Sequence, residues 1–131
     1  MAALNETRNA TINDASMASQ GLLVKHHANG VMKTAAVTDV SVGVTAAESS
    51  RDAAGAYEGA TTGTVAVYPL SGIVYVKCMA ISTAEFGEPL YVGTDDGFVD
   101  DSASNSAVKV GYYAGEAKSI AAGDLVPMFC L

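Results

Sequence analysis

The sequence predicts an all-β protein, folded as a small β-barrel or β-tulip-like domain. Short apolar segments recur from residue 21 to residue 131, and Gly-containing turns separate them. Strands at this spacing are typical of barrels and sandwiches. No segment sustains the helical period of about 3.6 residues, and residues 82–86 could form one turn at most. With 50% apolar residues, 16% charged residues and 13 Gly, the composition favours a compact β domain.

The length of 131 residues indicates one domain, large enough to bury a sizeable core. We divide it into an extended N-terminal arm at 1–20 and a single β-barrel-like domain at 21–131. The arm is rich in Asn, Thr, Ala and Ser and has no sustained period. Two alternatives stay open for it: a frayed terminus, or an arm that orders against a neighbouring subunit.

In the second alternative, separated side chains of the arm would contact the partner. Leu4, Ile12 and Met17 would be separated apolar anchor residues on an extended chain. Arg8 is the only base before Lys25, and we expect it to pair with a partner carboxylate. The predicted partner-binding residues are therefore Leu4, Arg8, Ile12 and Met17.

The first strands are predicted around a clear turn. Segments 21–27 and 30–34 flank Asn29-Gly30, and Asn-Gly is a strong signal for a β-hairpin. Segment 37–45 alternates, which predicts a strand with Val40, Val42 and Val44 on one face. Residues 48–62 are predicted to form a loop.

Segments 64–70 and 73–79 are predicted to form a second hairpin about Ser71-Gly72. The first of these is apolar on both faces. Such a strand belongs either to the middle of a barrel wall or to a subunit interface. The apolar excess on both segments predicts a homotrimer, because a chain of this length would struggle to cover it alone.

The second half repeats this pattern. Segment 89–93 leads through a turn at 95–97 into 98–99, and 107–113 forms a further strand. The chain closes on the apolar segment 123–131, which predicts a C-terminal strand within the sheet.

Charge and hydropathy exclude two classes of partner. The net charge is −7 and the seven Lys and Arg are scattered, so we expect no nucleic-acid partner. No apolar stretch approaches the ~18–20 residues that span a bilayer, so we expect no membrane partner. Acidic residues are concentrated between Lys77 and Lys109, where their field would suit a basic protein surface or keep the protein soluble.

No catalytic, cofactor-binding or metal-binding residue is predicted, and we do not expect an enzyme. Asp95-Asp96-Gly97 with Asp100-Asp101 suggests a calcium site, but a solvated Gly turn explains the pattern better. His26 and His27 would point to opposite faces of a strand and could not share a metal there. No nucleophile elbow, phosphate loop or zinc-protease motif is present.

The N-terminus lacks the features of a secretory signal, so we expect synthesis in the cytoplasm. In a reducing compartment Cys78 and Cys130 would be two small buried thiols, and a disulfide between them is the alternative.

An ordered series of segments resembles the tailed-phage capsid decoration proteins, also called head-stabilising or cement proteins. The best matches are Gly87-Glu88-Pro89-Leu90-Tyr91-Val92-Gly93 with Asp96-Gly97-Phe98-Val99, and Ile120-Ala121-Ala122-Gly123-Asp124-Leu125-Val126. The remaining segments that carry the resemblance are 21–24, 41–44, 63–67, 72–76 and 110–111.

The resemblance implies a β-barrel or β-tulip domain, commonly a homotrimer. It would sit at local threefold positions on the outer capsid surface of the virion and bind the major capsid protein. No catalytic residues would be carried over. The chain departs from the family in its longer polar N-terminal segment and in the 48–62 loop. The alternative is a carbohydrate- or receptor-binding β-module using the six Tyr, although the absence of Trp disfavours it.

Overall fold

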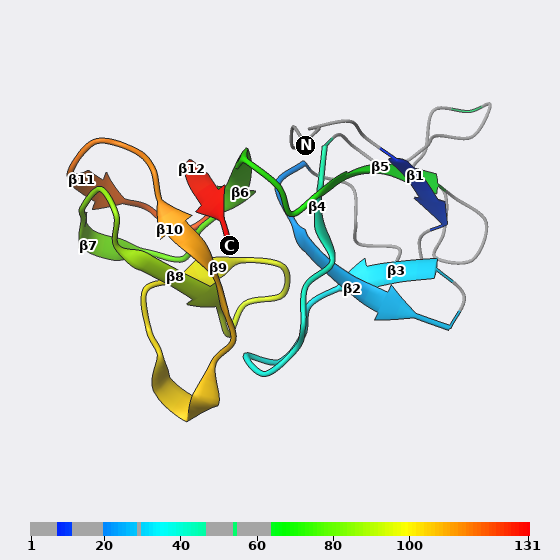
Figure 1. The fold of residues 1–131 in the computed structure, drawn as a ribbon, viewed down its shortest axis with the longest axis horizontal. Coiled ribbons are helices and arrows are strands. Elements are labelled where there is room, and N and C mark those ends of the chain that lie inside the picture. The colour runs from blue at the N-terminus through cyan, green and yellow to red at the C-terminus, as the bar shows by residue number, and fades with distance from the viewer. Residues whose placement is uncertain (1–7, 12–19, 29, 47–53, 55–63) are drawn as a thin grey trace.

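A computed structural model describes residues 8–11, 20–28, 30–46, 54 and 64–131. Within these residues the protein is built from two five-stranded antiparallel sheets and one two-stranded sheet, which confirms the predicted all-β class. The two larger sheets lie side by side in Figure 1, the first on the right and the second on the left.

The first sheet is curled. In spatial order its strands are β1 (Arg8–Thr11), β5 (Thr64–Pro69), β4 (Gly43–Thr45), β2 (Leu23–His27) and β3 (Gly30–Lys33). The two outer strands, β1 and β3, come near each other and partly close the curl. The predicted hairpin about residues 29–30 is confirmed, because β2 pairs with β3 from Val24↔Lys33 to His27↔Gly30.

The second sheet contains the C-terminal strand. Its order is β6 (Ile73–Lys77), β12 (Leu125–Cys130), β10 (Lys109–Tyr113), β8 (Pro89–Val92) and β9 (Val99–Asp100). The two-stranded sheet consists of β11 (Lys118–Ile120) and β7 (Ile81–Ala84). Residues Ser104–Ser106 form a short 3-10 turn. Because β12 lies between β6 and β10, the prediction of a C-terminal strand within the sheet is confirmed.

The predicted hairpin of segments 64–70 and 73–79 is wrong. Both form strands, but β5 belongs to the first sheet and β6 to the second. The physical reason is that β5 already pairs with β1 on one edge and with β4 on the other. Gly72, at a φ of 65°, redirects the chain, and β6 pairs instead with β12.

The predicted strand over 37–45 is also wrong over most of its length. Only Gly43–Thr45 is a strand, and residues 36–38 form a turn. The carboxylate of Asp39 stabilises this turn by accepting hydrogen bonds from the N–H groups of Ala35 and Ala36, at 2.7 and 2.9 Å. As a result Val40 and Val42 are 69% and 48% exposed.

The main core lies between the two larger sheets. Leu23 and Val44 of the first sheet pack there with the inward residues of the second sheet. A smaller cluster of Val24, Val65 and Val67 fills the opposite face of the first sheet. The first sheet therefore packs against apolar residues on both faces, and this place in the barrel wall explains the two-sided apolar pattern of β5.

The turn at Asp39 predicts an acid-sensitive contribution to stability. Burial acts to raise the pKa of Asp39, but the hydrogen bonds from Ala36 and Ala35 and the Lys25 ammonium at 2.9 Å outweigh it and lower the pKa from 3.8 to about 2. A carboxyl with a depressed pKa stabilises the fold above its unfolded pKa, and this stabilisation is lost as the pH falls towards its folded pKa.

We expect Asp39→Asn to lower the free energy of unfolding by about 1–2 kcal/mol above about pH 4, and by little near pH 2. Thermal melting of both proteins at intervals from pH 2 to pH 5 measures this difference. An equal deficit of the variant at every pH would contradict the ionic origin of the effect.

Candidate interaction surface

The outward face of the second sheet carries a row of apolar side chains across four strands. Phe129 on β12 lies opposite Ile73 on β6 and opposite Tyr112 on β10. Tyr112 in turn lies opposite Pro89 on β8. Residues that pair directly across an antiparallel sheet share one face, so these four side chains form one continuous row.

Neighbouring residues widen this row into a patch. Pro127 lies opposite Tyr75, and Leu125 lies opposite Lys77. Phe86, which is 67% exposed, packs edge-to-face on Phe129 with the ring centroids 5.8 Å apart. We call Ile73, Tyr75, Phe86, Leu125 and Phe129 the apolar face; their exposed fractions are 46%, 61%, 67%, 37% and 37%.

The size of the apolar face indicates a use in binding. Together these side chains expose on the order of 500 Å² of mainly apolar surface, given the ~150–250 Å² that one aromatic side chain can bury. Monomeric soluble proteins rarely expose contiguous apolar patches beyond a few hundred Å², and larger ones mark interaction sites. The apolar face is therefore the candidate functional site.

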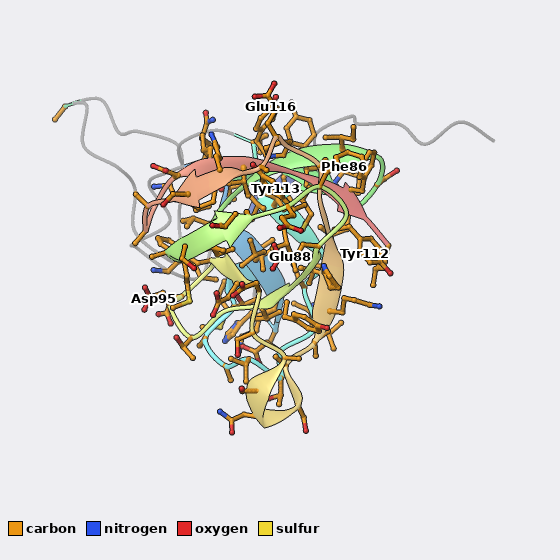
Figure 2. All side chains as sticks on the ribbon, turned by 90° about the vertical axis from the view of Figure 1, so that its left-hand side faces the viewer. Phe86, Glu88, Asp95, Tyr112, Tyr113 and Glu116 are labelled. Atoms are coloured by element: carbon orange, nitrogen blue, oxygen red, sulfur yellow. The ribbon has the colours of Figure 1, made fainter. Side chains whose placement is uncertain are left out.

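Charges of both signs surround the apolar face. Lys77 lies opposite Leu125 in the sheet, and Glu85 and Glu88 flank Phe86 in the chain. The Nζ atom of Lys109 lies 5.2 Å from the centre of the Tyr112 ring and 3.2 Å from its hydroxyl oxygen. In Figure 2, Phe86 and Tyr112 lie on one side of the molecule and Asp95 lies on the other. The turn that contains Asp95 therefore lies away from the apolar face.

The acidic segment 95–101 contains most of the turn between β8 and β9, and β9 itself. Phe98 donates its N–H to the carbonyl oxygen of Asp95, and Gly97 has a φ of 79°, so the segment closes as a Gly turn. Burial, reinforced by the Asp101 and Asp95 carboxylates, raises the pKa of Asp100. Among the described residues, no three carboxylate, imidazole or thiol groups gather as metal ligands would.

A groove of about 410 Å³ opens where the two larger sheets meet. Tyr68 of β5 lines its wall on the first sheet, and residues 73–75 of β6 line the opposite wall. The remaining lining residues are Gln20, Gly21, Thr45 and Ala46. Because Ile73 and Tyr75 belong both to the groove and to the apolar face, the two features form one continuous surface.

Of the predicted partner-binding residues, the structure places only Arg8, which does not belong to this surface. Arg8 begins β1 and pairs with Val67 of β5, in the first sheet. Leu4, Ile12 and Met17 lie outside the described residues, as does the predicted 48–62 loop except Ala54.

Sequence reasoning missed the apolar face. The alternation of Ile73 and Tyr75 with Val74 and Val76 showed that β6 is apolar on both sides. It could not show which side the rest of the chain covers.

The two cysteines are free thiols. Cys78 is buried in the main core, where burial, followed by the charges of Asp100 and Asp101, raises its pKa to about 12. Cys130 is half-buried, and burial raises its pKa as well. Since the thiolate is the nucleophile, neither thiol is activated for covalent chemistry.

No helix in the described part of the chain is long and apolar enough to cross a membrane. No protein-family model matches the chain, and no curated protein matches its sequence.

Proposed function

We propose that this protein is a structural decoration protein that binds the major capsid protein on the outside of a phage head and stabilises the shell. The observation that carries the proposal is the apolar face, which is exposed on an otherwise acidic chain of net charge −7. The resemblance of residues 21–131 to capsid decoration proteins supports the choice of the major capsid protein as the partner.

Docking would act by burying surface across the seams between capsid subunits. A typical specific interface buries about 800 Å² on each partner, so the apolar face would supply its centre and polar residues its rim. Repetition over a head makes modest affinity at each site sufficient. Internal pressure would then have to break these additional contacts before the shell opened.

The proposal includes assembly as a homotrimer at local threefold positions. Sedimentation velocity over a range of concentrations measures the oligomeric state in solution. A trimer supports this part of the proposal, and a strict monomer both at high concentration and on the head contradicts it.

Electron cryo-microscopy of heads tests the function directly. Heads from the phage that encodes this chain are compared with heads from the same phage lacking the gene. We expect density for the β domain on the outer surface of the first heads only. Absence of that density from both samples would contradict the function.

Shortening the arm is expected to weaken decoration. Deleting residues 2–7 should lower capsid occupancy several-fold and change the melting temperature by no more than about 2 °C, because β1 is retained. Deleting residues 2–20 also removes β1 and uncovers the edge of β5, so it should lower the melting temperature too. Occupancy on heads and thermal melting are measured for both. Undiminished occupancy after the shorter deletion would contradict a binding role for residues 2–7.

The second candidate function is a carbohydrate-binding module, which the groove favours because Tyr68 and Tyr75 both line it. A glycan array with specific binding that Tyr75→Ala removes would support this alternative, and an array without binding would exclude it in favour of decoration.

A further inference from the structure

The bonding pattern of β6 follows from two hydrogen bonds at the ends of its ladder with β12. Cys130 donates its N–H to the carbonyl oxygen of Gly72 at 2.9 Å, and Cys78 donates to the carbonyl oxygen of Asp124 at 3.0 Å. In an antiparallel ladder the hydrogen-bonded pairs alternate with non-bonded pairs. Val74 and Val76 therefore bond to β12, and the N–H and C=O groups of the residues between them point to the opposite edge.

That opposite edge is closed at one end only. The N–H of Lys77 donates to the carbonyl oxygen of Gly21 at 2.7 Å, so residue 21 occupies the edge there. Within the described part of the chain, the outward backbone groups of Ile73 and Tyr75 have no hydrogen-bond partner. These two residues present four unpaired backbone groups in the geometry that a further strand requires.

The groove lies along this same edge. It is lined by residues 73–75 on one side and by Gln20, Thr45 and Tyr68 among others on the other. Among the described strands, only β12 pairs with β6, so no strand of the first sheet hydrogen-bonds to this edge. Every lining residue is uncharged, although the chain carries a net charge of −7. An uncharged lining favours an uncharged occupant, because a buried unpaired charge is costly.

We propose that the free edge of β6 at Ile73–Tyr75 binds an extended, uncharged segment of the capsid protein by strand addition. This inference rests on the proposed function and specifies how the partner is held. The segment would comprise about three residues, spanning roughly 10 Å, and would form up to four backbone hydrogen bonds.

Strand geometry also specifies the side chains of the bound segment. A residue added opposite Tyr75 projects onto the apolar face beside its ring, and the adjacent residues project into the groove towards Tyr68. Apolar or small uncharged side chains suit both positions. The edge therefore sets the direction of the segment, and the two flanking surfaces select its sequence.

Tyr75→Pro tests the edge, with Tyr75→Thr as the matched control. Proline removes the outward N–H, while the bonds that β6 makes to β12 belong to residues 74 and 76. Threonine also removes the aromatic ring but keeps the N–H. We expect Tyr75→Pro to bind undecorated heads about tenfold more weakly than Tyr75→Thr, with both proteins folded by circular dichroism.

Hydrogen–deuterium exchange of the wild-type protein on heads provides a second measurement that does not depend on the folding of the proline variant. We expect the amides of Ile73 and Tyr75 to exchange about tenfold more slowly in the bound state than in the free state. Unchanged exchange at both amides would overturn strand addition, and so would equal binding of the folded Tyr75→Pro and Tyr75→Thr variants. In either case, binding of the wild-type protein to heads would leave the proposed function intact. If the wild-type protein does not bind heads at all, the proposed function fails and this inference fails with it.

Discussion

Replacing both Tyr75 and Phe129 by glutamate is expected to abolish decoration of heads and leave the β domain folded. Both side chains are exposed, at 61% and 37%, so the fold tolerates charge there. A docked partner would desolvate the two new carboxylates without pairing them, which costs several kcal/mol. We expect at least a hundredfold loss of affinity, of the order produced by ~3 kcal/mol, measured by co-sedimentation with undecorated heads.

A control of equal charge lies elsewhere on the surface. Val40→Glu with Val42→Glu also replaces two exposed apolar residues, at 69% and 48%, outside the apolar face. This control is expected to bind like the wild type. Equal loss in both double variants would show a general effect of charge, and wild-type binding by the Tyr75/Phe129 variant would exclude the apolar face as the docking surface.

Gly111→Ala is expected to be the most destabilising single-methyl change in the second sheet. Gly111 lies on β10 between β12 and β8, and a Cβ there would overlap the carbonyl oxygen of Phe129 and lie 2.7 Å from the Cγ of Met128. The overlap is with backbone, which cannot rotate away. We expect a loss of about 3 kcal/mol in the free energy of unfolding, measured by denaturant titration.

The matched control separates crowding from backbone conformation. Gly123→Ala meets no atom within 4 Å but must adopt a φ of about 90°. It should cost about 1 kcal/mol, from backbone strain alone. A Gly111→Ala variant no less stable than Gly123→Ala would contradict the close packing of β10 against β12.

One turn signal of the sequence predicted a hairpin correctly, and another, Ser71-Gly72, did not. Asn29-Gly30 correctly marked the β2–β3 hairpin, because such a turn brings together residues only a few positions apart. The strand predicted from the alternation over Val37–Thr45 was wrong over most of its length. The Asp39 carboxylate accepts hydrogen bonds from the N–H groups of Ala35 and Ala36, and the chain turns there.

The candidate site was much less accessible to sequence reasoning. The apolar face depends on Phe129 lying opposite Ile73, two residues 56 positions apart in the chain. The edge-to-face contact between Phe86 and Phe129 depends on the same long-range pairing. No local pattern specifies such a register, because many pairings satisfy the same alternation of apolar residues.

The sequence by itself determined the all-β class, the positions of most strands and the absence of a recognised catalytic motif, since periodicity, turn residues and composition act locally. Only the tertiary structure decided that β5 and β6 belong to different sheets and that β5 packs against apolar clusters on both faces. It also decided that β6 keeps one apolar face exposed and part of one edge unpaired. The physical reason is that Val65–Tyr68 and Ile73–Val76 have equivalent apolar patterns. The sheet that each segment joins depends on which distant strands pair with its edges, and the packing of the whole chain determines that pairing.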